Sequence, residues 1–322
     1  MNIIFFESNK REISAVKNAF SGHKVEFISE ALNEKNLSKA KDADVISIFI
    51  YSKINSAMLD KMKRLKLIAT RSTGYDHIEL EACRKRNILV SNVPRYGENT
   101  VAEHAFALLL AISRKIIDAK EQVKIRKIDL ESLPCFDLKD KTLGVIGAGR
   151  IGLSMIRMAK GFNMNVLAYD IFQNAESAKE AGFRYVSLEH LLKSSDVISI
   201  HALLTEQTRH LLDKRAFEKM KPGVVIINTA RGPIIELSAL IKALKENKVA
   251  AAGLDVFEHE TLLIKENKED MPIHYLINSK KVIITPHMAF YSRESLERII
   301  EITLENINSY LLNKPVNLVK NE

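Results

Sequence analysis

The sequence predicts an α/β protein with two doubly wound parallel sheets, each in a domain of its own. Three observations support this prediction: a length of 322 residues, an alternation of short Ile- and Val-rich runs with longer amphipathic stretches, and a glycine-rich turn behind one of the runs. A chain of this length exceeds what one hydrophobic core usually organises, so two domains are expected. The alternation is typical of repeated strand–helix–strand units, which form parallel sheets.

Five strand-like runs come first along the chain. They are residues 2–6, 24–28, 44–50, 67–70 and 88–91. The stretches between them, such as residues 53–63, have amphipathic patterns and are expected to be helical connections. Together these runs predict a small flavodoxin-like domain with a five-stranded sheet.

A second series of six strand-like runs predicts a larger sheet. The runs are residues 142–146, 165–169, 196–200, 224–228, 250–254 and 282–285. Amphipathic stretches connect them as helical crossovers, and six such strands make a full doubly wound sheet.

Two helical segments flank the second series. Thr100 and Glu103 have the spacing of a capping box ahead of the apolar stretch 105–116, which predicts a long helix that joins the domains. Behind the last run, the apolar positions of residues 292–313 keep helical spacing, and this tail is expected to pack back on the first domain. The expected domains are therefore residues 1–99 with 288–322, and residues 100–287.

Composition and charge narrow the class of protein. Hydrophobic residues make up 46% of the chain and charged residues 27%, as in ordinary folded proteins. The net charge of +8 is spread along helical stretches and forms no basic arm, so a nucleic-acid partner is not expected. Cys83 and Cys135 have neither CxxC nor metal-ligand spacing, which favours a reducing cytoplasm and no metal site. No apolar run is long enough to span a membrane or serve as a signal peptide.

The glycine-rich turn indicates a dinucleotide site. Gly147, Gly149 and Gly152 follow a buried run and open a helix, as a tight turn next to a pyrophosphate requires. The motif alone is weak, because a glycine-rich turn without a ligand has the same pattern. The next strand ends in Asp170, at the distance expected for a carboxylate that binds ribose hydroxyls. Residues 171–174 offer no Arg or Lys for a 2′-phosphate, so a Rossmann domain that binds NAD is predicted.

Polar residues end most strands of this domain, where parallel sheets bind ligands. They are Gly147, Asp170, His201, Arg231, Asp255 and His287. Reduction of a keto acid needs a cation for the substrate and an acid for the nascent alkoxide, which Arg231 and His287 can supply. Glu260 could pair with the imidazole and favour its protonated form. Each residue also has a structural interpretation: a turn ion pair for Arg231, a structural hydrogen bond for His287, and an exposed surface position for Glu260.

Six motifs, in order, resemble those of the D-isomer-specific 2-hydroxyacid dehydrogenases, and the resemblance covers nearly the whole chain. They are RSTGYDHIE (71–79), NVPRYGENTVAEHAFALLL (92–110), GVIGAGRIG (144–152), VIINTARGPIIE (225–236), GLDVFEHE (253–260) and TPHMAFYS (285–292). The loop reads GYDHI where many relatives have GVDNI, so Tyr75 and His77 could change the size of substrate accepted.

The resemblance implies a set of roles for individual residues. Arg231 would hold and polarise the substrate, His287 would be the general acid and base, and Glu260 would tune the histidine. The backbone N–H groups of Thr73 and Gly74 would receive the substrate carboxylate, and Asp255 would sit near the nicotinamide. The other cofactor contacts implied are Thr100, Gly147, Gly149, Arg150, Ile151, Gly152, Asp170, Thr229 and Ala230. A homodimer joined through the cofactor domains is also implied.

The branch of the family is suggested by aromatic residues. Phe290, behind His287, and Tyr96 match the pattern of D-lactate and D-2-hydroxyisocaproate dehydrogenases, and Tyr51 ends the third strand-like run. These three residues are expected to line the substrate pocket, with ordinary aromatic packing as the alternative. Reduction of pyruvate to D-lactate is the expected reaction, with hydroxyisocaproate-type activity or hydroxypyruvate and glyoxylate reduction as alternatives. A different class, an NAD-sensing corepressor, also occurs on this fold and remains open.

Overall fold

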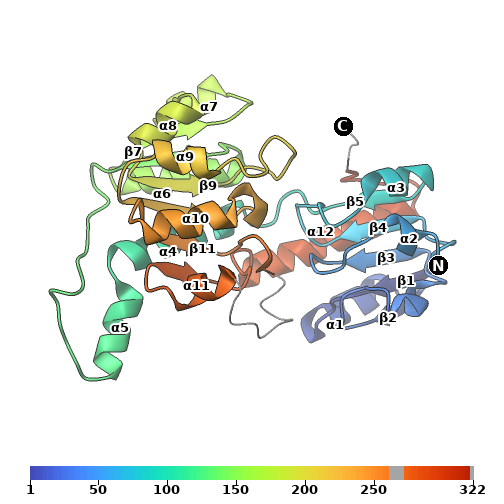
Figure 1. Cartoon of the computed structure of the whole chain (residues 1–322). Coiled ribbons are helices and arrows are strands. Elements are labelled where there is room, and N and C mark those ends of the chain that lie inside the picture. The colour runs from blue at the N-terminus through green and yellow to red at the C-terminus, as the bar shows by residue number, and fades with distance from the viewer. Residues whose placement is uncertain (261–271, 320–322) are drawn as a thin grey trace. The chain divides into compact units, whose positions relative to one another are not determined.

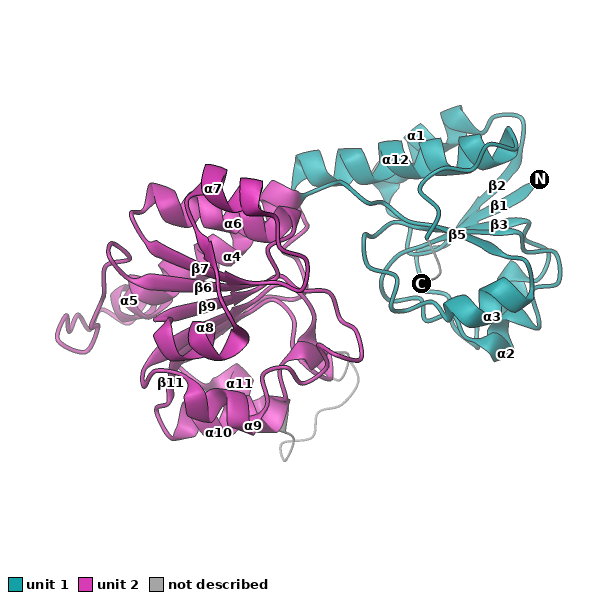
Figure 2. Cartoon of the chain, turned by 90° about the horizontal axis from the view of Figure 1, so that it is seen from above, with its two compact units in different colours: residues 1–97, 292–322 teal, residues 98–291 magenta. Residues whose placement is uncertain are grey.

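The computed structural model describes residues 1–260 and 272–319 (Figure 1). The chain divides into two compact units: unit 1 comprises Met1–Gly97 and Ser292–Glu322, and unit 2 comprises Glu98–Tyr291 (Figure 2). The sequence placed these divisions after residues 99 and 287, and the structure has them after residues 97 and 291. The C-terminal helix belongs to the same unit as the N-terminal strands.

Unit 1 contains a five-stranded parallel sheet in the order β2-β1-β3-β4-β5. The strands are β1 Asn2–Phe5, β2 Lys24–Phe27, β3 Val45–Ile48, β4 Leu67–Thr70 and β5 Leu89–Ser91. This is the flavodoxin-like order, as predicted. Ile4 and Ile46 face one layer of the core and Ile3 and Val45 face the other, so the central strands are buried on both sides. Burial on both sides explains why these strands read as continuous apolar runs.

Helices cover both faces of this sheet (Figure 2). They are α1 Lys10–Ala19, the 3-10 helix η1 Leu37–Ala40, α2 Ser56–Leu59, α3 Leu80–Lys85 and α12 Arg293–Leu311. Helices α1 and α12 lie on one face and α2 and α3 on the other. The helix expected over residues 53–63 is wrong in length, because α2 is only four residues long. It begins late because Ile54 forms a β-bridge with Ile78 and the side chain of Asn55 accepts a hydrogen bond from Met58 N as the helix cap.

Unit 2 contains a seven-stranded parallel sheet in the order β12-β11-β10-β9-β6-β7-β8. The strands are β6 Thr142–Ile146, β7 Asn165–Tyr169, β8 Arg184–Tyr185, β9 Val197–Ile200, β10 Val224–Asn228, β11 Val249–Leu254 and β12 Val282–Ile284. Numbered from β6, this is the Rossmann order with one more strand at the β12 edge. The predicted count of six was one too low, because β8 has only two residues and its Arg184 is exposed.

The helices of unit 2 form two layers, apart from α5, which has no buried residue. They are α4 Glu98–Ser113, α5 Ile116–Lys124, α6 Arg150–Gly161, α7 Ala175–Ala181, α8 Leu188–Ser194, α9 Lys214–Lys219, η2 Gly232–Ile234, α10 Leu237–Lys245 and α11 Pro272–Asn278. Leu109 of α4 and Ile156 of α6 belong to one core layer, whereas Phe217 of α9 and Leu240 of α10 belong to the other. None of the helices in the described residues is both long and apolar enough to cross a membrane.

Helix α4 begins earlier than the capping-box pattern predicts. It starts at Glu98, so Thr100 lies within its first turn and the expected cap is wrong. The amide side chain of Asn99 donates a hydrogen bond to Glu103 Oε1, one helical turn away. The carboxylate expected to complete the capping box therefore binds Asn99.

Candidate active site

The glycine turn between β6 and α6 has the geometry of a dinucleotide site. Gly147 has a φ of +92°, and a Cβ there would lie 2.5 Å from the backbone N of Ala202 behind β9. A Cβ on Gly152 would lie 2.0 Å from the carbonyl O of Gly147. A Cβ on Gly149 would meet nothing within 4 Å, so this glycine is not required by internal packing. Its small size instead lets a ligand approach the backbone, as pyrophosphate binding requires.

Replacing Gly152 by alanine is expected to damage both the fold and the cofactor site. The new methyl group would overlap a backbone oxygen, so α6 must shift, at a cost of about 1 to 3 kcal/mol of unfolding free energy. Chemical denaturation and NADH titration measure the two effects. Gly161→Ala, in the same helix and with nothing within 4 Å of its Cβ, is the matched control. Equal behaviour of the two variants would contradict the packing argument.

Asp170 follows β7 and lies beside the glycine turn. Its Oδ2 accepts a hydrogen bond from Ala148 N at 2.7 Å, and its Oδ1 accepts one from Phe172 N at 2.9 Å. The carboxylate is therefore fixed at the first turn of the nucleotide fold, where a ribose is bound in this architecture. The neighbouring Ile171 and Phe172 are exposed and carry no positive charge.

The other predicted cofactor residues lie around the same end of the sheet. Arg150 and Ile151 are the first residues of α6, and Thr100 lies in the first turn of α4. Thr229 and Ala230 follow β10, and Thr229 is buried. All of them belong to unit 2.

A buried aspartate fixes the loop that carries His287. The Asp255 carboxylate is only 1% exposed and accepts hydrogen bonds from Thr285 Oγ1 at 2.5 Å, Met288 N at 2.9 Å and Ala289 N at 2.8 Å. His287 between them adopts a left-handed conformation with a φ of +52°, which costs a non-glycine residue free energy. The hydrogen bonds of Met288 N and Ala289 N to Asp255 hold the backbone that follows His287.

The imidazole of His287 forms a pair with Glu260. His287 Nδ1 lies 2.9 Å from Glu260 Oε1, and Glu260 Oε2 accepts a hydrogen bond from Phe257 N at 3.3 Å. The Glu260 carboxylate can only accept this hydrogen bond, so the contact selects the tautomer with the proton on Nδ1. Nε2 is then the nitrogen that can give a proton to a substrate or take one from it.

Arg231 lies on a loop that packs closely against the Glu260 segment. A Cβ on the next residue, Gly232, would lie 2.2 Å from the carbonyl carbon of Phe257, so only glycine permits this approach. The amide side chain of Asn228 fixes the loop by donating to Arg231 O at 3.0 Å and accepting from Ala230 N at 3.0 Å. Arg231 Nη1 donates to Ala230 O at 2.8 Å.

Two further histidines lie near these loops. His201, behind β9, is partly buried, and desolvation of its imidazole lowers its pKa to about 4, so it is uncharged at neutral pH. His104 of α4 lies 3.0 Å from Thr285 Oγ1 and 3.5 Å from Asp255 Oδ1, both measured from its Nε2. Sequence reasoning missed His104, because its partners are far away along the chain and no motif links them.

In unit 1, the loop behind β4 presents backbone amides. The carbonyls of Ser72 and Thr73 accept hydrogen bonds from Val93 N at 3.0 Å and Asn92 Nδ2 at 2.8 Å. Within the described residues, the N–H groups of Thr73 and Gly74 have no acceptor. Consecutive backbone amides of this kind can bind an anion.

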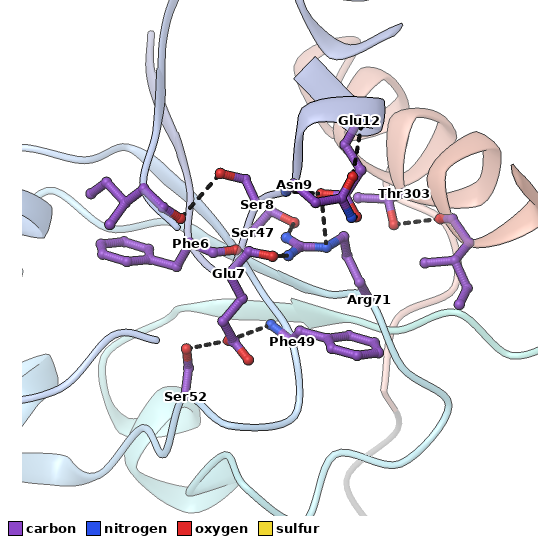
Figure 3. A network of polar contacts seen from close by, with 12 residues as sticks. Phe6, Glu7, Ser8, Asn9, Glu12, Ser47, Phe49, Ser52, Arg71 and Thr303 are labelled. Carbon is purple, nitrogen blue, oxygen red and sulfur yellow. Dashed lines mark hydrogen bonds and ion pairs between the residues drawn. The ribbon is translucent and has the colours of Figure 1, made fainter. Parts of the chain in front are cut away.

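The ends of β1, β3 and β4 are joined by a buried arginine, Arg71 (Figure 3). Arg71 is 1% exposed, and its Nη2 donates to Phe6 O at 2.7 Å and Glu7 O at 3.0 Å. Its Nη1 donates to Ser47 Oγ at 3.0 Å, and its Nε lies 3.9 Å from Glu12 Oε2. Burial raises the pKa of Glu12 despite this cation. Sequence reasoning missed Arg71, since an arginine behind a strand usually reaches solvent.

The three aromatic candidates lie in different units. Tyr51 and Tyr96 belong to unit 1 and Phe290 to unit 2. Tyr51 is half exposed, and its backbone N donates to Glu7 Oε1 at 2.9 Å. The carbonyl of Tyr96 accepts a hydrogen bond from Arg298 Nη1 at 3.0 Å, and the rings of Phe290 and Tyr291 are 5.8 Å apart.

Unit 2 combines a nucleotide-binding sheet with loops behind its strands that carry a histidine–carboxylate pair and an arginine. This combination defines the class of NAD-dependent oxidoreductases that act on a CH–OH group. The chain belongs to the D-isomer specific 2-hydroxyacid dehydrogenase family, since the model of that family's NAD-binding domain matches residues 106–289. NAD is accordingly the cofactor.

Individual relatives agree with this assignment over nearly their full length. A D-lactate dehydrogenase of Escherichia coli is 37% identical over 308 residues, which cover 94% of this chain and 93% of that protein. An aromatic 2-oxoacid reductase of Clostridium sporogenes is 39% identical over 323 residues, with 97% of each chain covered. The structure of an Aquifex aeolicus D-lactate dehydrogenase with NAD and lactic acid has a TM-score of 0.91 at 37% identity, covering 97% and 96% of the two chains. Glyoxylate reductases and a D-2-hydroxyisocaproate dehydrogenase are also similar.

Proposed function

We propose that this enzyme reduces pyruvate to D-lactate, with NADH as the hydride donor. The observation that carries the proposal is the His287–Glu260 pair, 2.9 Å apart, on a loop whose conformation is fixed by the buried Asp255. The choice of pyruvate is supported by the similarity to D-lactate dehydrogenases and by Phe290, an apolar residue three positions behind His287. The similar aromatic 2-oxoacid and glyoxylate reductases define the alternatives.

The proposed mechanism uses three side chains. Arg231 binds the 2-oxo acid and polarises its carbonyl, and the imidazolium of His287 gives the Nε2 proton to the carbonyl oxygen as the alkoxide forms. Glu260 keeps the imidazole oriented through its contact with Nδ1. NADH supplies the hydride when bound. In the opposite direction, neutral His287 takes the hydroxyl proton of the 2-hydroxy acid.

We further propose that Thr73 and Gly74 receive the substrate carboxylate through their backbone amides. For the cofactor, the glycine turn and residues Thr100, Arg150, Ile151, Asp170, Thr229 and Ala230 are the proposed contacts. The predicted contact between Asp255 and the nicotinamide stays a proposal, and the carboxylate oxygens of Asp255 already bind residues 285, 288 and 289.

The loss of NADH absorbance across a set of 2-oxo acids tests the substrate assignment. The set contains pyruvate, 2-ketoisocaproate, phenylpyruvate, hydroxypyruvate and glyoxylate, with NADPH as the cofactor control. Highest kcat/KM for pyruvate supports the proposal. Preference for a bulkier acid would replace pyruvate by a hydroxyisocaproate-type or aromatic substrate, and preference for glyoxylate or hydroxypyruvate would replace it by those acids. NADH binding without any turnover would favour the sensor class.

Replacing Asp170 by alanine is expected to weaken NADH binding by about 10- to 100-fold, because a charged acceptor for the ribose hydroxyls is lost. The KM for the 2-oxo acid should change less. Fluorescence titration with NADH measures the first effect and steady-state kinetics the second. Glu176→Ala, an exposed carboxylate of α7, is the control for charge alone. Unchanged NADH affinity in Asp170→Ala would remove the assignment.

We also propose a cytoplasmic homodimer joined through the NAD-binding unit. Five aliphatic residues of α5 and the segment behind it are exposed in the single chain: Ile116, Ile117, Val123, Ile125 and Ile128. Such a patch is typical of an interface.

Cys83 and Cys135 are both free thiols, in keeping with a reducing compartment. Sedimentation should give twice the monomer mass, and Ile128→Glu should shift the equilibrium toward monomer; a monomeric wild-type protein would contradict the proposal.

A further inference from the structure

His77, in the motif GYDHI (residues 74–78), begins a series of hydrogen bonds within unit 1. His77 Nε2 lies 3.1 Å from Thr70 Oγ1, and Thr70 Oγ1 lies 2.8 Å from Ser72 Oγ. Ser72 Oγ donates to the carbonyl of Gly74 at 2.6 Å. Thr70 is fully buried and Ser72 is 3% exposed. The series therefore runs through the protein interior from His77 to the loop of the proposed carboxylate site.

The direction of every hydrogen bond in this series follows from proton counting. A carbonyl oxygen can only accept a hydrogen bond, so Ser72 donates its single hydroxyl proton to Gly74 O. Ser72 Oγ must then accept a hydrogen bond from Thr70 Oγ1. The single hydroxyl proton of Thr70 is used in this bond. Thr70 Oγ1 is thus an acceptor toward His77, and the proton between them must be on Nε2 of His77. The geometry selects one tautomer of this histidine.

The series holds one of three carbonyls that determine the orientation of the loop. Val93 N holds Ser72 O, Asn92 Nδ2 holds Thr73 O, and Ser72 Oγ holds Gly74 O. In a trans peptide the C=O and N–H groups point in opposite directions. The hydrogen bonds that hold these three carbonyls therefore also fix the N–H groups of Thr73, Gly74 and Tyr75. These N–H groups point away from the carbonyls and can bind an anion.

We infer that His77 is a positioning residue for the substrate carboxylate, acting through Thr70 and Ser72 on the Gly74–Tyr75 peptide, directly behind the amides of Thr73 and Gly74. The carboxylate part of this inference rests on the proposed function. The tautomer part depends only on the hydrogen-bond geometry of unit 1, so the two can fail separately.

The tautomer is tested by nitrogen NMR of the whole protein at a pH where the imidazole is neutral. Long-range proton–nitrogen correlations distinguish Nε2–H from Nδ1–H imidazoles, and loss of one signal in His77→Phe assigns the residue. We expect the Nε2–H pattern for His77. An Nδ1–H pattern would overturn the inference, whatever the enzyme reduces.

The positioning role is tested by kinetics of variants that break or keep the series. His77→Phe and Thr70→Val remove a donor at nearly constant volume and should raise KM for the 2-oxo acid about tenfold, with kcat and KM for NADH nearly unchanged. His77→Gln, which can place an amide donor near Nε2, and Thr70→Ser should restore much of the lost KM. The control is Thr303→Val, which deletes another buried hydroxyl of unit 1, bonded to Ile299 O at 2.7 Å.

The outcomes separate the possible failures. Unchanged KM in both His77→Phe and Thr70→Val would overturn the positioning role. A fall in kcat, or an equal effect in Thr303→Val, would also overturn it, because general loosening of unit 1 would explain the result. If the wild-type protein reduced no 2-oxo acid, the proposed function would fail, whereas the NMR result would still decide the tautomer.

Discussion

Replacing His287 by alanine is expected to lower kcat by about 100-fold or more, because the reaction loses its general acid and base. Binding of NADH should be spared, since His287 lies behind β12 on a loop held by Asp255 rather than at the glycine turn. Steady-state kinetics with the best 2-oxo acid, together with NADH titration, measure the two quantities. Near-normal turnover would reject the role assigned to the imidazole.

A matched control and a partner variant sharpen this test. His190→Ala removes an exposed histidine from α8 and should leave kcat unchanged. Glu260→Gln keeps the size of the side chain but removes the charge opposite His287 Nδ1, so it should lower kcat less than His287→Ala does. A larger loss in Glu260→Gln than in His287→Ala would assign the proton transfer to the carboxylate.

Replacing Arg71 by methionine is expected to lower the free energy of unfolding by about 3 to 5 kcal/mol, the usual cost of removing one partner of a buried charged network. The carbonyls of Phe6 and Glu7 would lose their donor at Nη2, and Glu12 would lose the cation near its carboxyl. Methionine fills similar space, so cavity formation contributes little. Urea or guanidinium denaturation measures the change in the free energy of unfolding.

Two further variants show whether burial causes this effect. Arg64 forms an ion pair with Asp44 at 3.0 Å but is 61% exposed, so Arg64→Met should cost at most about 1 kcal/mol. Adding Glu12→Gln to Arg71→Met should recover part of the loss, because an uncompensated buried carboxyl is removed. Equal losses in Arg71→Met and Arg64→Met would contradict the network described above.

The sequence is most informative where a strand is buried on both faces. The central strands of both sheets are continuous apolar runs, and β6, β7 and β10 have the predicted bounds. Edge strand β8 was missed because it has two residues and no apolar pattern. Helix α2 was predicted too long, because periodicity does not reveal that Ile54 pairs with Ile78.

Only those residues of the candidate site that belong to a recognisable sequence motif could be predicted. Motif positions identified Arg231, Glu260 and His287 as candidates, and the structure adds the left-handed φ of His287 and the three hydrogen bonds at Asp255. The contact of His104 with Thr285 joins residues 181 positions apart, so no local pattern could indicate it. Long-range contacts of this kind follow from the order of strands in the sheet rather than from any short segment.

The identity of the product decides whether the enzyme is a D-lactate-forming pyruvate reductase. The whole enzyme is incubated with NADH and pyruvate, and the lactate formed is counted against the NADH consumed and separated into its enantiomers. We expect one lactate for each NADH, all of it D, and a rate that falls by about 100-fold or more in His287→Ala. L-lactate, or pyruvate left unreduced in the presence of bound NADH, would contradict this expectation.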